Sequence, residues 1–231
     1  MSEPQGLRID RKSTSDQAAA ALREQILQGQ LRPGTPLQEV SLATAFGISR
    51  NTMRESLRLL VYEGLVQHTP HRGAAVMALT ETDVADIYGV RRLLELAAVN
   101  ATRDAPTTEF ELLGEIVEEM GPSSLARDWP RTVELDMRFH QCLVEFLRSE
   151  RMSNLLQTTL AELRLALVLV DRADSDNAAA TQVSEHRTIA DLVAQGRQGE
   201  CAEVLLRHLN SAEAKLRAVV AIQPDASVVE I

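Results

Sequence analysis

Two polar residues interrupt the apolar stripe of ELDMRFHQCLVEFL, residues 134–147, which otherwise has the periodicity of a helix. Asp136 and His140 are four residues apart, so their side chains project side by side from one helical face. Two later helical segments each carry one histidine on their apolar stripe, His186 and His208. Burying three imidazoles and a carboxylate costs free energy unless they share a partner. Three nitrogens and one oxygen suit a divalent transition metal, so the pattern predicts a metal site formed by Asp136, His140, His186 and His208.

This ligand set leaves several roles open. Each histidine taken alone is also consistent with a core residue satisfied by its neighbours. Zinc, nickel and manganese all accept imidazole with one carboxylate, so the ligands do not identify the ion. An open metal site can acidify a bound water and support hydrolysis, but Glu185 adjoins His186 and points about 100° away around the helix. Because no general base is placed with the site, we expect no enzyme and one divalent ion per chain, which either senses a ligand or is purely structural.

Six helices are expected to position these residues. Apolar periodicity and polar breaks place them at residues 80–104, 107–120, 129–149, 151–173, 178–196 and 199–221. Thr80 and Asp83 form a reciprocal helix-start signal for the first of them. Helices of this length joined by short polar segments form an antiparallel bundle, and the predicted fold class is mostly α.

The first of these helices carries a candidate anion-binding residue. Arg91 or Arg92 borders the apolar stripe in YGVRRLLELAA, residues 88–98, and an arginine is suited to bidentate capture of a carboxylate. Arg164 is a second candidate for the same role. The alternative is an exposed Arg91 that pairs with Glu95 one turn further along. The residues expected to form the stripe are Val90, Leu93, Leu94 and Ala97. The pattern favours a small organic acid as an effector bound between the metal and Arg91.

Charge divides the chain into two parts. Of its 231 residues, 45% are hydrophobic and 25% charged, which is typical of a globular protein, and the formal net charge is −9. Residues 1–78 carry a net +2, whereas residues 79–231 carry −11. The acidic total excludes a generic binder of polyanions but leaves the first part free to contact DNA. We expect a flexible arm at 1–14, one domain at 15–78, a second at 79–222 and a tail at 223–231.

Neither membrane insertion nor disulfide bonding is expected. The longest aliphatic run, LALVLV at 165–170, is too short to cross a bilayer, and the first residues have no apolar signal segment. Cys142 and Cys201 form no CxxC motif and are expected to be reduced, buried residues. These features favour a cytoplasmic protein.

The first domain has the order of helix starts, turns and helix ends that is typical of a DNA-binding motif. A helix ends near Gly29, a Pro-Gly turn follows, and a short helix ends at Gly47. Ser49 then caps a second helix that presents cations and amides near its start and packs Met53, Leu57, Leu60 and Val61 inward. Two β-like runs around TPHRG suit a hairpin wing. Such a helix enters the major groove, and a two-fold homodimer would match a palindromic operator in double-stranded DNA.

These segments resemble the winged helix-turn-helix of the GntR family of transcriptional regulators. The resemblance rests on ALREQILQG, LRPGTPL, Glu39, SLATAFGISRNTMRESLRLLVYEGLV and RGAAV. It implies that the DNA-contacting residues are Ser49, Arg50, Asn51, Thr52, Arg54, Arg72 and Gly73. Thr52 stands where the family often has proline, and Val40 stands where some members have a DNA-contacting arginine. These departures leave the operator sequence undefined.

The second half resembles the FCD effector domain of the FadR-type subfamily. The matching stretches are DMRFHQCL, SEHRTIADLVAQGRQGEC and LLRHL. The resemblance implies that Asp136, His140, His186 and His208 hold a divalent metal, which disfavours the acyl-CoA-binding variant that lacks this set. It also implies that Arg91 is the pocket arginine, and it favours a repressor over an activator.

Overall fold

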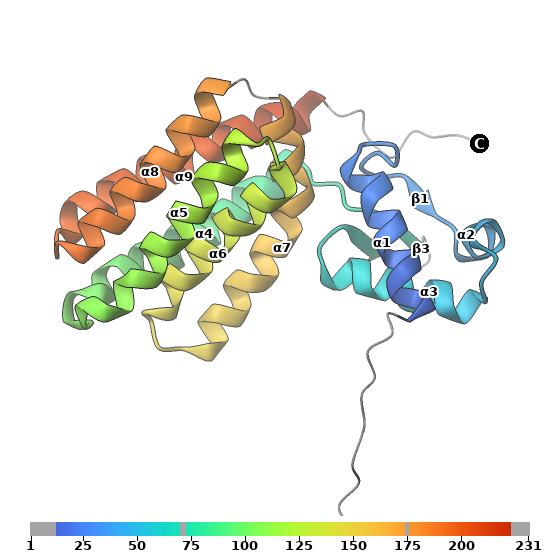
Figure 1. Cartoon of the computed structure of the whole chain (residues 1–231), viewed down its shortest axis with the longest axis horizontal. Helices are drawn as coiled ribbons and strands as arrows, with labels where there is room; N and C mark the ends of the chain where they lie inside the picture. The colour runs from blue at the N-terminus through green and yellow to red at the C-terminus, as the bar shows by residue number, and fades with distance from the viewer. Residues whose placement is uncertain (1–12, 70–72, 174–175, 223–231) are drawn as a thin grey trace, which may run out of the picture. The chain divides into compact units, whose positions relative to one another are not determined.

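The computed structural model describes residues 13–69, 73–173 and 176–222. The chain forms two compact units, Met1–Val76 and Met77–Ile231, each treated by itself below. Most of the described chain is helical, and the only described sheet is a small antiparallel one in the first unit (Figure 1). The arm expected at 1–14 lies outside the described residues apart from Ser13 and Thr14, and the tail expected at 223–231 lies wholly outside them.

The first unit is a three-helix motif followed by a hairpin. Helix α1 packs against α3, and Leu22, Met53 and Leu60 are fully buried between them and their neighbours. Its start is fixed by a capping box in which Ser13 and Asp16 each bind the other's backbone N–H. The elements are α1 (Thr14–Leu27), β1 (Pro36–Leu37), α2 (Glu39–Phe46), α3 (Arg50–Tyr62), β2 (Val66–Thr69) and β3 (Gly73–Val76).

The turn between α2 and α3 sets the direction of α3. Gly47 ends α2 in the left-handed conformation, with φ 64°, and its N–H bonds back to the last turn. Ser49 then caps α3 by accepting a hydrogen bond from the Thr52 N–H at 3.1 Å. Helix, tight turn and capped helix therefore form as expected.

The hairpin gains a strand that the sequence analysis did not predict. β2 and β3 pair antiparallel, with Val66 opposite Val76 and His68 opposite Ala74. The two-residue β1 pairs with the other edge of β3, giving the strand order β1-β3-β2. A strand of two residues is too short to show the alternation of apolar and polar residues by which a strand is predicted. Its pairing depends on a partner strand far along the chain. Arg72, expected at the hairpin tip, lies outside the described residues.

The second unit is a bundle of α-helices. Helix α4 packs against α9, α5 against α6 and α8, and α6 against α7 (Figure 1). One continuous core of aliphatic and aromatic residues fills the space between them. The helices are α4 (Glu81–Ala101), α5 (Glu111–Leu125), α6 (Trp129–Glu145), α7 (Glu150–Ala173), α8 (Asp176–Ala194) and α9 (Gln198–Ile222). Two short 3₁₀ helices, Thr102–Asp104 and Thr107–Phe110, connect α4 to α5.

The break expected after residue 120 is wrong. Helix α5 continues through Pro122 to Leu125. A proline lacks the N–H donor and its ring crowds the carbonyl four residues earlier, but Pro122 lies in the last turn, so the disturbance is confined to the end of the helix. The Ser123 hydroxyl donates to the Met120 carbonyl at 2.9 Å, and the Ala126 N–H donates to the Pro122 carbonyl at 3.0 Å. Within the described residues, no helix is long and apolar enough to span a membrane.

Candidate functional site

Helix α3 presents its polar face outward. Arg50 and Asn51 are exposed, Arg54 is half-buried, and Met53 and Leu57 point into the core. Val61 was expected on the inner side but is 41% exposed. The start of α3 therefore offers charged and amide groups on a rigid, capped helix, as insertion into a DNA groove requires.

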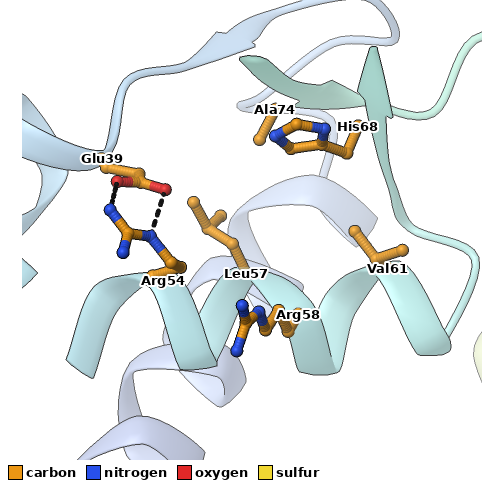
Figure 2. Close-up of a pocket in the computed structure, with 7 residues that line it drawn as sticks. All are labelled: Glu39, Arg54, Leu57, Arg58, Val61, His68 and Ala74. Carbon is orange, nitrogen blue, oxygen red and sulfur yellow. Dashed lines mark hydrogen bonds and ion pairs between the residues drawn. The ribbon is translucent and has the colours of Figure 1, made fainter. Parts of the chain in front are cut away.

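The two arginines at the start of α3 share one carboxylate. Glu39 accepts hydrogen bonds from Arg50 Nε at 2.9 Å and from Arg54 Nε and Nη2 at 3.0 Å each. Figure 2 shows the two bonds to Arg54. The Arg54 and Arg50 hydrogen bonds lower the pKa of Glu39 to about 2. Arg58, further along α3, pairs instead with Glu55 at 2.7 Å.

A cavity of about 350 Å³ lies beside these arginines, where α3 meets the hairpin strands. Figure 2 shows the side chains around it, with His68 and Ala74 on the strands and Leu57 on the helix. Gly73 begins β3 at φ 82°, a conformation that favours glycine. The lining residues are Glu39, Arg54, Leu57, Arg58, Val61, His68 and Ala74.

The bundle brings the four predicted metal ligands together. Asp136 and His140 come from α6, His186 from α8 and His208 from α9, and all four are buried. One ligand atom from each lies within 4.8 Å of the others. His186 Nε2 is 3.1 Å from Asp136 Oδ1 and 3.3 Å from His140 Nε2.

Each histidine has its Nδ1 atom held by an acceptor outside the cluster. His140 Nδ1 lies 2.7 Å from Glu95 Oε2, and His208 Nδ1 lies 2.8 Å from Glu185 Oε2. His186 Nδ1 lies 2.8 Å from the backbone carbonyl of Gln182. An acceptor at Nδ1 leaves Nε2 free to bind a metal and orients the ring.

The donor set fits a divalent metal. Two Nε2 atoms at 3.3 Å agree with the separation of about 3.0–3.4 Å that ligands at about 2.1 Å from one ion would have. Burial lowers the pKa of His208 to about 4 and also lowers that of His140, so both rings are neutral, as metal binding requires. Burial acts in the same direction on His186, but its hydrogen bond to Asp136 raises its pKa overall, so a metal would displace the proton on that ring. Burial would raise the pKa of Asp136, but the hydrogen bond to His186 and the nearby His140 lower it overall, which keeps the carboxylate ionised.

Arg91 is buried next to this cluster. The alternative of an exposed Arg91 paired with Glu95 is therefore wrong about the exposure but right about the partner. The residue is 1% exposed, and its Nε donates to Glu95 Oε1 at 2.8 Å. The other oxygen of Glu95 contacts His140. One carboxylate therefore joins the candidate anion-binding arginine to a candidate metal ligand. Burial opposes ionisation of Glu95, but Arg91 and His140 lower its pKa to about 2.

The stripe expected on α4 is wrong in phase except at Leu94, which is buried as expected. Leu93 is 73% exposed, Ala97 is exposed and Val90 is half-buried. Arg91 and Glu95 neutralise each other and are buried together, which a pattern based on apolar residues alone does not detect. The buried face is Val84, Ile87, Tyr88, Arg91, Leu94, Glu95, Ala98 and Val99.

Two buried polar atoms beside Glu95 have no hydrogen-bond partner among the described residues, the Tyr88 hydroxyl and Arg91 Nη2. The Arg91 guanidinium carbon lies 5.0 Å from the centroid of the Tyr88 ring. Burial raises the pKa of Tyr88 to about 12, so the hydroxyl keeps its proton. Buried polar groups are nearly always paired, and these two donors are therefore available to an oxygen-rich ligand.

The other predicted arginines lie apart from the cluster. Arg164 is half-buried on α7, with no hydrogen bond or ion pair to a described residue. Arg92 points to α9 and donates to Glu213 at 2.5 Å.

Several site residues were missed or misplaced by the sequence analysis. Glu185 does not point away from the site, because it binds the outer nitrogen of His208 on the neighbouring helix. Gln182 donates to Asp136 Oδ1 at 2.9 Å and lies one turn before His186, a spacing that could have identified it. Glu39 carries no local signal, since its partners are on another helix. Glu95 was expected only as the partner of Arg91, and its contact with His140 on α6 carries no local signal. Glu95 and Glu185 both bind outer nitrogens, so neither is placed as a base for a metal-bound water.

Two protein-family models match the chain. The model described as "Bacterial regulatory proteins, gntR family" matches residues 14–76, and the FCD domain model matches residues 86–211. The HTH-type transcriptional regulator YdhC of Bacillus subtilis (strain 168), described as uncharacterized, is 30% identical over 191 residues. That alignment covers 82% of this chain and 84% of YdhC.

A repressor and a solved structure are also similar. The gluconate operon transcriptional repressor of Bacillus licheniformis is 33% identical over 137 residues, which cover 59% of this chain and 56% of that protein. A GntR regulator structure from Rhodococcus sp. RHA1 is 27% identical and superposes with a TM-score of 0.70, covering 88% of this chain and 97% of that one. The chain therefore belongs to the GntR family of bacterial regulatory proteins, as a DNA-binding transcriptional regulator with an FCD domain and not an enzyme.

Proposed function

We propose that this regulator represses transcription as a homodimer on a palindromic operator, and that a small organic acid bound at a divalent metal in the FCD domain changes its affinity for DNA. The observation that carries the proposal is the buried cluster of Asp136, His140, His186 and His208, with each Nδ1 held from outside. The similarity to a gluconate operon repressor supports repression. Since the target is chromosomal DNA, we place the protein in the cytoplasm.

The DNA-reading surface is assigned to the start of α3 and to the hairpin tip. Helix α3 is called the recognition helix from here on. Side chains at the start of such a helix reach base edges, whereas the tip and the capping residues contact the backbone and set the register. The helix is exposed and capped as this role requires. The proposed DNA-contacting residues are Ser49, Arg50, Asn51, Thr52, Arg54, Arg72 and Gly73.

The metal centre is assigned to the cluster on α6, α8 and α9. When bound, a divalent ion with four protein ligands supplies a positive centre with positions for an oxygen ligand. The protein orients its imidazoles through Glu95, Gln182 and Glu185. Zinc, nickel and manganese all agree with this donor set.

The effector is assigned to the region where this cluster adjoins Arg91. Arg91 is close enough to Asp136 for the two to interact electrostatically, and its Nη2 atom is unpaired among the described residues. A carboxylate oxygen of a small acid would accept from Arg91 Nη2 and from the Tyr88 hydroxyl, gaining charge-assisted hydrogen bonds in a buried site. Arg164, on the neighbouring α7, is a weaker second candidate.

Regulation requires that the acid favour one state of the protein over another. A ligand with equal affinity for both states does not change their relative populations. A difference of about 1–3 kcal/mol changes operator occupancy by roughly 5- to 150-fold, which is sufficient for a switch.

The experiment that tests the proposal is a thermal-shift screen of carboxylates, sugar acids and amino acids on metal-loaded full-length protein. Compounds that raise the unfolding temperature are then titrated into an operator mobility shift at fixed salt. The proposal expects a hit that changes DNA affinity and that no longer binds His140→Ala/His186→Ala protein. If the compounds that bind leave DNA affinity unchanged, the metal-linked sensor fails, while the DNA-binding function stands.

Replacing Tyr88 with phenylalanine is expected to weaken effector binding without destabilising the protein. The hydroxyl is buried and has no hydrogen-bond partner among the described residues, so its removal relieves a desolvation cost of about 1–3 kcal/mol instead of breaking a bond. Thermal unfolding without effector should therefore occur at the same or a higher temperature than in the wild type. Isothermal titration with a hit from the screen should show a weaker affinity, and an unchanged affinity would remove Tyr88 from the effector site.

A further inference from the structure

Glu39 is the first residue of α2, and its carboxylate lies over the start of the recognition helix. It is a first-turn acid, so the positive end of the α2 dipole favours its charge. Glu39 is one of the positions that match the family motif, but the resemblance assigned it no role. Its partners are the two arginines assigned to base contacts, and Arg58, which pairs with Glu55, is not one of them.

Each arginine binds Glu39 through a defined set of its guanidinium N–H groups. Arg54 uses Nε and Nη2, and Arg50 uses Nε alone (Figure 2 shows Arg54). A guanidinium has five N–H groups, and these contacts leave the Nη1–Nη2 edge of both side chains with N–H donors that no described residue accepts. That edge is the fork that donates two parallel hydrogen bonds to N7 and O6 of guanine.

The arrangement also restricts the two side chains. An exposed arginine samples many rotamers, and ordering it on binding costs free energy. A carboxylate that holds Nε fixes the plane and direction of the guanidinium before DNA arrives. Glu39 Oε2 serves both arginines, and Oε1 completes the bidentate pair with Arg54, so one residue orients both.

We infer that Glu39 is a positioning residue for base recognition, which holds Arg50 and Arg54 by their Nε edges so that their outer edges read guanine. The inference rests on the proposed assignment of these arginines to base contacts. Glu39 touches no base itself. Its negative charge near the DNA backbone weakens binding to all sequences alike, so only its positioning of the two arginines raises the ratio of specific to non-specific affinity.

A simpler role for Glu39 is neutralisation of charge, with both ion pairs broken on DNA. Exposed ion pairs contribute little, and their loss would be tolerated. In that case removing the charge would strengthen binding to every sequence equally and leave the preferred bases unchanged. The two roles therefore differ in base preference and not in overall affinity.

The test is selection of double-stranded oligonucleotides from a random pool by full-length wild type, Glu39→Gln, Arg54→Ala and Glu55→Gln, followed by affinity measurements at fixed salt. Glu55→Gln is the matched control, since it removes the same charge from α3 but frees only Arg58. We expect guanines in the wild-type consensus that Arg54→Ala no longer selects. Glu39→Gln should lose about 10-fold in discrimination at those guanines, measured against 7-deazaguanine, while Glu55→Gln retains it.

Every other outcome overturns either the role of Glu39 or the assignment of the recognition helix. If Arg54→Ala loses the guanines and Glu39→Gln keeps them, the role of Glu39 is overturned and the recognition helix assignment stands. If Arg54→Ala selects the same sequences as wild type, the assignment of the recognition helix fails first. Equal loss in Glu39→Gln and Glu55→Gln would show an effect of charge alone. Thermal unfolding of each variant confirms that the winged unit is folded.

Discussion

Replacing His186 with alanine is expected to abolish stoichiometric binding of a divalent metal. His186 lies closest to the other ligands, 3.1 Å from Asp136 and 3.3 Å from His140, and its ring is fully buried. Loss of a residue that only orients a metal ligand typically reduces metal affinity about 10- to 100-fold, and loss of a ligand itself should cost at least about 100-fold. Elemental analysis of tag-free protein should find about one equivalent in the wild type and almost none in the variant.

The same change should remove the stabilisation that the metal provides. A ligand present at about 1,000 times its Kd stabilises the folded state by about 4 kcal/mol. For a protein of this size that corresponds to roughly 8–16 °C in Tm, at about 2–4 °C per kcal/mol. Metal should therefore raise the Tm of the wild type by this amount and leave the variant unchanged.

His68→Ala is the control for this experiment, because His68 is an exposed histidine on β2, outside the cluster. It should bind metal as the wild type does. If wild-type protein takes up no divalent ion, either as purified or after reconstitution, the four residues are a packed polar core. If His186→Ala binds as tightly as the wild type, the ion lies elsewhere.

The second large effect is expected at the recognition helix. Arg54→Ala should weaken operator binding by about 1–3 kcal/mol, or roughly 5- to 150-fold, if the side chain contacts a base. The Arg50→Ala/Arg54→Ala double variant should lose more, although not the sum, because the two arginines share Glu39 and are energetically coupled. Mobility shift at one salt concentration measures both.

Arg58→Ala provides the comparison on the same helix. Its side chain is 68% exposed and pairs with Glu55, so it is expected to act at most through the DNA backbone. Loss of Arg58 should weaken binding to operator and non-operator DNA by a similar factor. The DNA affinity of the variant should also depend less on salt than that of the wild type. Unchanged operator affinity in both Arg50→Ala and Arg54→Ala would show that another surface reads the bases.

Several helix ends, although not that of α5, were predictable from the sequence because they depend on residues three or four positions apart. Ser49 caps the recognition helix, Gly47 ends the helix before it, and Thr80 with Asp83 begins α4, as expected. The metal ligands were visible for the same reason. A polar residue on an apolar stripe stands out within a single helix, before any neighbouring helix is known.

Only the tertiary structure decided which polar residues meet. Glu95 contacts His140 across 45 positions, and Glu39 contacts the two arginines that were expected to be free for DNA. Arg91 is buried against the periodicity of α4 because Glu95 neutralises it. Hydrogen bonds and ion pairs between helices depend on which faces pack together, and that is determined by the whole core. Residue type and local spacing therefore determined the candidate ligands, whereas the packing of α4, α6, α8 and α9 determined how they are oriented and what holds them.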